Sequence, residues 1–256
     1  MDSAFLSLMA EVESQRMELS CTRSGAFFRG HSNGGYQLIP SLPRTQTHQD
    51  TEHNLYHECF ARANHLISRD ATSWERLAFF QHYGIPTRLL DWTESLGVAL
   101  FFAVKVKPER PHLWIMNAFR LNKSNGAAKR PRILLAGLDP IPDYHDCFIR
   151  VEGREEWPHK LPIFLQIPWT NERLRAQGGF FTFHPSPERM DEICRKYLRR
   201  VDIPDEAIPG AQRFLDLAGI TEHTVFPDVV GLAGFMRNRY ELKSHAEPGA
   251  PADAAL

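Results

Sequence analysis

The 256-residue sequence lacks the short motifs that mark several well-known enzyme folds. It has no G-x-G-x-x-G dinucleotide fingerprint, no P-loop and no closely spaced cysteine pair. Its four cysteines lie far apart, which favours free thiols in a reducing compartment over a disulfide framework. The usual sequence support for a Rossmann dehydrogenase, a P-loop NTPase or a zinc ribbon is therefore missing.

The sequence also has little net charge and no long apolar run. Lysine and arginine total 30 against 31 acidic residues, so no net field favours nucleic acid or an anionic membrane, although a local basic patch at 122–132 stays open. No apolar stretch approaches the roughly 18 residues of a membrane span. The first residues carry acids where a signal peptide carries bases. We expect a cytoplasmic protein that does not engage a membrane.

Hydrophobic periodicity predicts an α+β fold, with a single mixed-sheet domain and flanking helices. Helices are predicted at residues 3–18, 52–67, 74–82, 94–104, 187–197, 205–218 and 228–240. Strands are predicted at residues 26–29, 36–39, 88–92, 113–117, 163–167 and 180–184. Residues 122–142, rich in glycine, proline and basic side chains, are predicted to form a long surface loop. We expect the N-terminal helix to occupy residues 1–21, and the tail at 241–256, which has few large apolar residues, to be disordered.

The richest polar segment is the run QHYGIPTRLLDWTESLGVALFFA at residues 81–103. It places His82, Arg88, Asp91, Thr93 and Glu94 between apolar flanks. Burying such groups costs about 1 to 3 kcal/mol each unless they are paired. The run therefore indicates a functional site or a buried polar network.

Arg29 is the strongest candidate for a ligand contact. It follows apolar residues and precedes Gly30, so its guanidinium lies at a predicted strand end where the backbone can approach a ligand. The planar fork suits phosphate or carboxylate. An ion pair with a core carboxylate such as Asp91 is the structural alternative.

Arg88 and Asp91 are three residues apart on a predicted strand, so we expect them to face opposite sides and to have different partners. Asp91 is equally suited to cap the next helix, as is Thr93.

The histidines allow two further interpretations. His82 is a candidate general base because imidazole titrates near neutral pH, although a hydrogen-bonded structural histidine has the same sequence context. His53 and His57 are four residues apart, as two zinc ligands on a helix would be, but no third ligand is evident nearby. We therefore expect no metal site.

Several motifs, taken in order, resemble the FRG domain family, named for its Phe-Arg-Gly motif. They are FFRG at 27–30, YQLIPSLPR at 36–44, the run at 81–103, ERLRAQGGFFTFH at 172–184 and GITEHTVFPDVVGLA at 219–233. The resemblance covers roughly residues 22–235 and implies an FRG-like domain at 22–240. The family is known mainly as an uncharacterised bacterial domain, suspected of a role in toxicity or phage defence.

The layout also has a remote resemblance to ADP-ribosyltransferases of the R-S-E type, which have a split sheet. That resemblance implies that Arg29 and Gly30 form the first element, holding NAD as a substrate. Thr93 and Ser95, before an A-x-x-F-A helix, would form the second. Beside these elements, Arg88 is a further candidate for cofactor binding and His82 a further catalytic candidate. The third element of that family supplies a glutamate, but this chain has Gln177, with Glu172 and Glu94 as the nearest alternatives.

The resemblance thus implies an NAD-consuming enzyme, an ADP-ribosyltransferase or an NAD glycohydrolase, acting as a bacterial toxin or antiviral effector. Its partners would be a nucleotide, a protein or nucleic-acid acceptor, or an inhibitory protein. The absent glutamate leaves open a noncatalytic module that binds a nucleotide or signal and regulates a partner. An RNA-directed enzyme has support only from the basic run at 122–132, and such runs are usually solvated surface.

Overall fold

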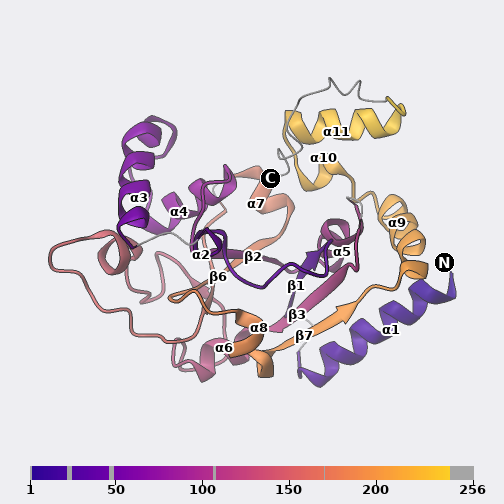
Figure 1. The fold of residues 1–256 in the computed structure, drawn as a ribbon, viewed down its shortest axis with the longest axis horizontal. Coiled ribbons are helices and arrows are strands. Elements are labelled where there is room, and N and C mark those ends of the chain that lie inside the picture. Colours follow the sequence, from indigo (N-terminus) through magenta and orange to yellow (C-terminus); the bar gives the residue numbers. More distant parts are fainter. Residues whose placement is uncertain (1, 22–24, 46–48, 106–107, 170, 243–256) are drawn as a thin grey trace.

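The computed structural model describes residues 2–21, 25–45, 49–105, 108–169 and 171–242. Among these residues the strands form one seven-stranded mixed sheet in the order β4-β5-β6-β2-β1-β3-β7 (Figure 1). The strands are β1 (Ala26–His31), β2 (Leu89–Thr93), β3 (His112–Asn117), β4 (Leu134–Leu135), β5 (Ile163–Gln166), β6 (Gly179–Phe183) and β7 (Leu198–Asp202). Neighbouring strands pair antiparallel except β4 and β5. The predicted mixed-sheet fold with flanking helices is confirmed.

Helices surround the sheet. They are α1 (Ser3–Glu18), α2 (Ser41–Arg44), α3 (Gln49–Ala63), α4 (Ser73–His82), α5 (Leu96–Val104), α6 (Ala118–Ser124), α7 (Glu172–Ala176), α8 (Met190–Ile193), α9 (Ile208–Leu217), α10 (Glu222–Val225) and α11 (Val229–Arg239). Short 3-10 turns lie at Asn64–Leu66, Arg195–Tyr197 and Asp205–Ala207, and a π turn lies at His145–Ile149. None of the helices in the described ranges is long and apolar enough to cross a bilayer.

Local sequence signals explain where two well-predicted helices start. The Asp2 side chain accepts the backbone N–H of Phe5 and caps α1, while Thr72 and Glu75 form a reciprocal capping box at the start of α4. The predicted helices at 3–18 and 74–82 are confirmed within one residue.

The sheet has a seam between β1 and β2. These strands pair at one position only, Phe28 opposite Thr93, whereas β1 pairs with β3 from Ala26 to His31. We call this junction the seam. It divides the sheet into a β4-β5-β6-β2 half and a β1-β3-β7 half.

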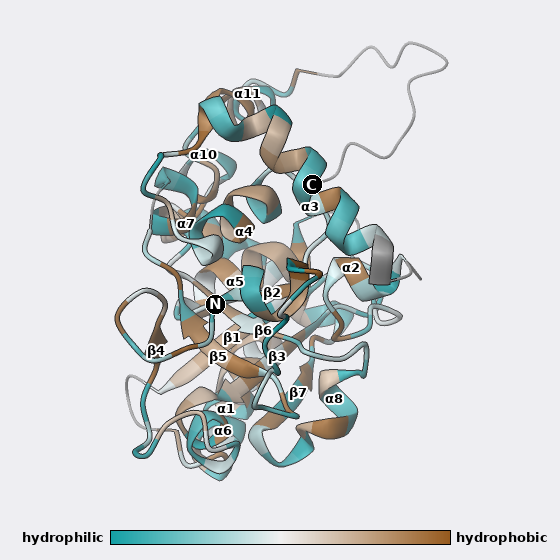
Figure 2. Cartoon of the chain, turned by 90° about the vertical axis from the view of Figure 1, so that its left-hand side faces the viewer, coloured by the Kyte–Doolittle hydropathy of each residue, from teal (hydrophilic) through white to brown (hydrophobic). Residues whose placement is uncertain are grey.

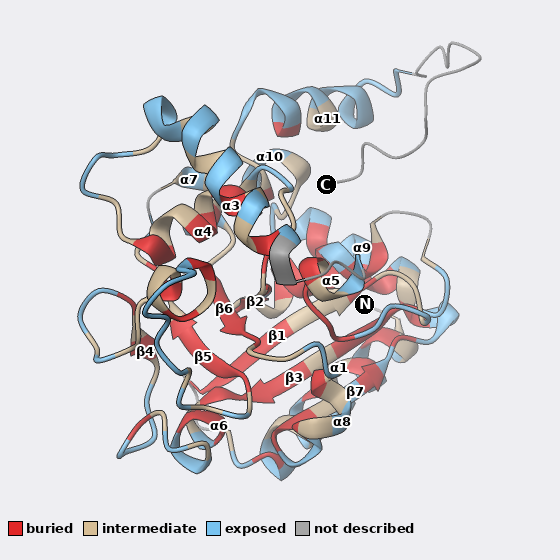
Figure 3. Ribbon diagram, turned by 60° about the vertical axis from the view of Figure 1, so that its left-hand side comes forward, coloured by how far each residue is buried: buried red, intermediate tan, exposed pale blue. Residues whose placement is uncertain are grey.

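The apolar packing across the seam differs between the two faces of the sheet. On one face α1, α5 and α9 pack over the β1-β3-β7 half, and α4 packs over the other half, so two separate apolar clusters form. On the opposite face a single cluster runs across both halves, from Met116 and Phe27 to Trp92 and Phe164. Figure 3 shows the strands as the buried layer between these coverings, and Figure 2 shows the polar residues on the outer helices. The seam is thus filled on one face and open to a cavity on the other.

Some sequence predictions for single elements are wrong. Residues 36–39 form no strand, because β3 rather than a hairpin partner pairs with β1. Leu38 is buried, and its backbone oxygen accepts from the N–H of Met190. In the predicted 187–197 helix only Met190–Ile193 is α-helical.

The predicted surface loop at 122–142 begins with the end of α6 and contains β4. Asn122 is fully buried and bonds both the N–H and the C=O of Phe164. Strand β7 was not predicted, because its two arginines interrupt the apolar pattern. Residues 243–256, most of the predicted disordered tail at 241–256, lie outside the described ranges.

Candidate functional site

A cavity of about 340 Å³ lies over the seam, between the two apolar clusters. Its walls come from β1, β2, β6, α2, α4, α5 and α7. The polar side chains that line it are Arg29, Ser41, Arg44, Gln81, His82, Asp91, Thr93, Arg173 and Gln177. The cavity therefore brings together Arg29, Gly30, His82, Thr93 and Gln177, five of the seven site residues predicted from the sequence.

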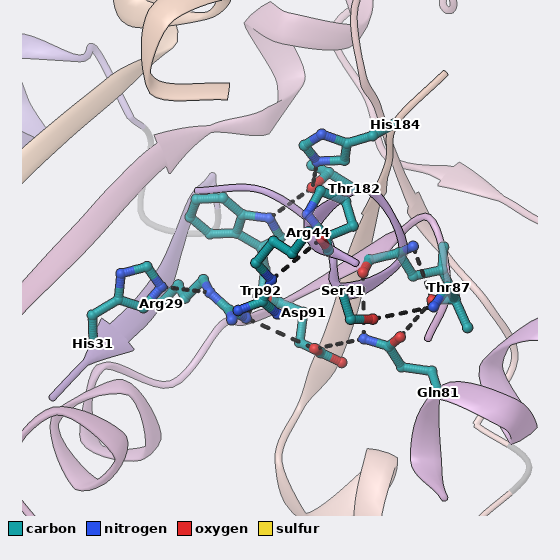
Figure 4. Close-up of polar contacts among 12 residues, drawn as sticks. Arg29, His31, Ser41, Arg44, Gln81, Thr87, Asp91, Trp92, Thr182 and His184 are labelled. Carbon is teal, nitrogen blue, oxygen red and sulfur yellow. Dashed lines mark hydrogen bonds and ion pairs between the residues drawn. The ribbon is translucent and has the colours of Figure 1, made fainter. Parts of the chain in front are cut away.

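Arg29 bridges the seam. Its Nη1 donates to the backbone oxygen of Asp91 at 2.8 Å, and its Nε donates to Nε2 of His31 at 3.0 Å (Figure 4). The nearest approach to the Asp91 carboxylate is longer, 3.8 Å from Nη1 to Oδ2. The guanidinium thus gives the Asp91 oxygen the N–H donor that the β1 backbone would provide in a continuous sheet. The two bonds use two of the five N–H groups of Arg29. Burial lowers the pKa of Arg29, while Asp91 raises it.

Two buried histidines extend this network away from the cavity. Because Nε2 of His31 accepts from Arg29, His31 carries its proton on Nδ1 and donates to Nε2 of His112 at 3.2 Å. Burial, followed by the Arg29 charge, lowers the pKa of His31 to about 2. Burial likewise lowers the pKa of His112 to about 4. Both rings are therefore neutral, and His31, itself held by His112, accepts from Nε of Arg29.

Asp91 lies in the middle of β2 and caps no helix, so the predicted capping role is wrong. Its side chain is 52% exposed although the residues beside it in β2 are buried. Oδ2 accepts a hydrogen bond from Nε2 of Gln81 at 2.9 Å. Among the residues that line the cavity, Asp91 is the one carboxylate.

Thr93 and Gln177 line the cavity, and their side chains make internal hydrogen bonds. The Thr93 hydroxyl donates to the backbone oxygen of Gln177 at 2.6 Å and accepts from the N–H of Ser95 at 3.0 Å. The Gln177 amide donates to the backbone oxygen of Val225 at 3.2 Å. These bonds hold the start of α5, the end of α7 and α10 together.

Ser95 and Arg88 do not line the cavity. Ser95, rather than Thr93, is the N-cap of α5, and its Oγ accepts from the N–H of Val98 at 3.3 Å. Arg88 instead forms a bidentate ion pair with Glu52, at 2.7 and 2.6 Å. Its side chain is 13% exposed and that of Glu52 is 6% exposed. Both residues were predicted to contact a ligand, but in the structure they hold a helix start and an ion pair instead.

Gly30 lines the cavity, but its missing side chain makes room for a helix rather than for a ligand. A Cβ on Gly30 would lie 1.8 Å from the backbone oxygen of Ala99, so the absent side chain lets α5 pack directly on β1. The glycine of the Arg-Gly pair thus sets the position of one cavity wall.

No side-chain hydrogen bond or ion pair is described for His82, nor for Arg173, which also lines the cavity. His82 lies at the end of α4 and is partly buried. Burial lowers its pKa, and the charge of Arg173 lowers it further, while Asp228 raises it. The ring is therefore largely neutral at pH 7, as a general base must be.

Sequence reasoning missed four polar cavity residues, Ser41, Arg44, Gln81 and Arg173. Each lies inside a motif that the sequence analysis singled out, yet nothing in a single sequence indicates that α2, α4 and α7 line one cavity. The cation of Arg173 lies 4.3 Å over the ring of Phe226, and burial lowers its pKa.

The chain also contains a G-x-S-x-G pattern at residues 30–34, which includes Ser32. In the structure β1 ends at His31 and leads into a turn rather than a helix. Ser32 does not line the cavity. The pattern therefore lacks the strand-turn-helix geometry of a nucleophile elbow.

The two alternative glutamates lie outside the cavity. Glu172 is exposed and pairs with Arg175, and Glu94 is exposed beside Gly178. Neither reaches the lining.

Metal-ligating groups gather elsewhere. The ring centroids of His53 and His57 lie 4.3 Å apart with the ring planes tilted, and Nδ1 of His53 contacts the backbone oxygen of Ile149. Ligand atoms of Asp143, His145 and Asp146 lie within 4.8 Å of one another. Asp143, however, accepts from the Ser73 hydroxyl and from two backbone N–H groups, as a residue that closes a turn does.

Comparison with known proteins finds a family model that matches part of the chain. The family model for the FRG domain matches residues 24–111, a shorter range than the 22–235 expected from the motifs. The matched segment contains β1, α4, β2 and α5, whereas β6 and α7 lie beyond it. No curated protein and no solved structure matches the chain. The elements that supply Arg29, His82 and Asp91 to the cavity thus lie within the segment that matches the FRG domain model.

Proposed function

We propose that the cavity over the seam binds NAD and that the protein is an NAD-consuming, ADP-ribosyltransferase-like enzyme. One observation carries the proposal: Arg29, His82, Thr93 and Gln177 come from separate elements and line one cavity. At about 340 Å³ the cavity has the size of a small-molecule site.

The charge of the cavity supports a ligand with phosphates. Arg29, Arg44 and Arg173 line it against the single carboxylate of Asp91. The walls therefore carry a surplus of positive charge even though burial and Arg173 lower the pKa of His82. A planar guanidinium binds phosphate oxygens in pairs, which suits the diphosphate of NAD.

The seam is further support. A sheet that parts between β1 and β2, with an arginine of β1 at the opening, is consistent with the split sheet of the remote ADP-ribosyltransferase resemblance.

The direct test is release of nicotinamide from NAD by the purified protein, with and without protein, RNA and DNA acceptors. Arg44 is exposed and its one described hydrogen bond is to the backbone of Pro40, so Arg44→Ala should keep the fold. We expect this variant to lose about tenfold in kcat/KM, the effect of one charged hydrogen bond.

Arg62→Ala is the matched control, because Arg62 is 77% exposed on α3 and pairs with Glu58. It should behave as the wild type. Absence of nicotinamide release with every acceptor would exclude the enzyme.

A noncatalytic nucleotide-binding module is the second candidate. It is favoured by the internal hydrogen bonds that engage the Thr93 hydroxyl and the Gln177 amide nitrogen, because these groups then have structural partners. In this case NAD or ADP-ribose would raise the melting temperature without being consumed.

The cellular role that we propose is that of a toxin or antiviral effector whose target is a macromolecular acceptor, or whose activity an inhibitory protein controls. Expression of the wild type should then arrest bacterial growth, and Arg44→Ala should relieve the arrest. Equal growth of both strains would contradict this role.

A further inference from the structure

The cavity contains one carboxylate oxygen for which no partner is described. Oδ2 of Asp91 is held by Gln81 and lies 3.8 Å from Arg29, whereas no described hydrogen bond or ion pair involves Oδ1. With Glu94 and Glu172 outside the lining, Asp91 is the acidic group that a bound ligand would meet.

The orientation of Gln81 is fixed by its neighbours. The Thr87 hydroxyl accepts from the N–H of Leu89 at 3.0 Å, so its own hydrogen is free to donate to Oε1 of Gln81 at 2.5 Å. Gln81 must therefore present its oxygen to Thr87 and its NH₂ group to Asp91. That NH₂ group also donates to the backbone oxygen of Leu89, and Ser41 holds the N–H of Thr87.

This relay runs from α2 to the floor of the cavity, and Figure 4 shows its members in sequence. A neutral amide donor holds one carboxylate oxygen without neutralising its charge, unlike a close arginine. The second oxygen thus keeps its negative charge available to a positive centre.

We propose that Asp91 is the catalytic carboxylate of this site and that Gln81, oriented by Thr87, is its positioning residue. The assignment rests on the proposed function. In NAD the bond between ribose C1′ and the nicotinamide nitrogen breaks, and its electron pair leaves with neutral nicotinamide. Asp91 stabilises the positive charge that develops at C1′. Water or an acceptor hydroxyl then bonds to C1′, and its proton passes to Asp91 and on to solvent.

Two measurements test the assignment. The first compares the affinities for NAD⁺, whose nicotinamide ring is cationic, and for NADH, whose ring is neutral, by calorimetry. The wild type should prefer NAD⁺ by about tenfold because the Asp91 charge attracts the ring, and Asp91→Asn should bind both equally. The second measures turnover: Asp91→Asn should lower kcat by about 100-fold and leave KM for NAD within a few fold.

Thr87 provides a matched pair for the positioning role. Thr87→Ser keeps the hydroxyl and should retain both the NAD⁺ preference and kcat, whereas Thr87→Val should lose most of each. Melting temperatures of the two variants separate this effect from unfolding. Asp202→Asn, which removes a remote carboxylate 74% exposed on β7, should change neither quantity.

The outcomes separate the two proposals. Failure of both nucleotides to bind would reject the NAD function, and the role of Asp91 with it. Binding or turnover that is unchanged in Asp91→Asn would overturn the assignment of Asp91 and leave the NAD function standing. Binding without turnover still tests Asp91 through the NAD⁺ preference.

Discussion

Gly30 is the residue on which the approach of α5 to the sheet depends. The sequence correctly indicated that something must approach its backbone closely, but the partner is the helix at Ala99. A single sequence could not distinguish these possibilities, because a glycine admits a ligand and a helix equally well.

We therefore predict that Gly30→Ala destabilises the protein by about 3 kcal/mol or prevents folding, since its Cβ would overlap a backbone oxygen of a packed helix. Urea unfolding measures the effect. Gly234→Ala in α11 is the control, because a Cβ there meets ordinary contacts and a helix favours alanine. Equal stability of the two variants would contradict the packing role.

The buried histidines predict how stability depends on pH. Burial lowers the pKa of His31 to about 2, of His184 to about 3 and of His112 to about 4. In the unfolded chain each has a pKa of about 6.5 and takes up a proton first. The stability that the neutral rings contribute is therefore complete above about pH 6.5. It is lost as the pH falls toward their pKa values in the folded protein, by up to about 1.4 kcal/mol per pH unit for each ring.

The free energy of unfolding, measured in urea, should thus fall steeply between pH 6.5 and 5. His112→Asn should show a shallower slope, whatever its stability at pH 7.5. A flat profile over this range would contradict neutral, buried rings.

At the scale of elements, periodic patterns identified helices with strong caps, and packing overruled the weaker signals. Residues 3–18 and 74–82 were predicted well because caps and apolar spacing agree. Residues 36–39 failed because an apolar run before Pro40 has the same pattern whether it pairs or merely packs. The A-x-x-F-A helix was found, but its cap is Ser95, two residues after the predicted one.

We predict that Ser95→Ala lowers stability by about 1 kcal/mol, the usual cost of losing an N-cap, because the N–H of Val98 loses its acceptor. Thermal or urea unfolding measures the loss. Affinity for NAD should change little, since Ser95 lies outside the cavity lining. A variant of normal stability with tenfold weaker NAD binding would restore the ligand role that the family resemblance implies.

At the scale of the whole molecule, the site exists because β1 and β2 pair at one position only. On one face of the sheet the apolar clusters of the two halves are separate, and on the other face one cluster spans both halves. Most residues that line the cavity lie in motifs visible in the sequence, but the residues with which these motifs form bonds lie far along the chain. Arg88 pairs with Glu52, 36 residues away, and Thr93 contacts Gln177, 84 residues away. Such pairings depend on tertiary packing that no local pattern encodes.

The Arg88–Glu52 pair joins α3 to the start of β2, and the Tyr144 hydroxyl donates to the same carboxylate. We predict that Arg88→Met costs about 3 to 5 kcal/mol, because it leaves a buried carboxylate without its cation. Arg62→Ala, at an exposed pair on the same helix, should cost less than about 1 kcal/mol. Equal urea midpoints for the two variants would refute the structural role of Arg88.

The central claim is that NAD binds in the cavity over the seam, and hydrogen exchange with and without NAD, followed by mass spectrometry of peptides, tests it most directly. The account predicts slower exchange in peptides that cover β1, the end of α4, β2 and α7, and unchanged exchange in α9 and β7. Protection confined to other elements, or none at saturating NAD, would contradict it.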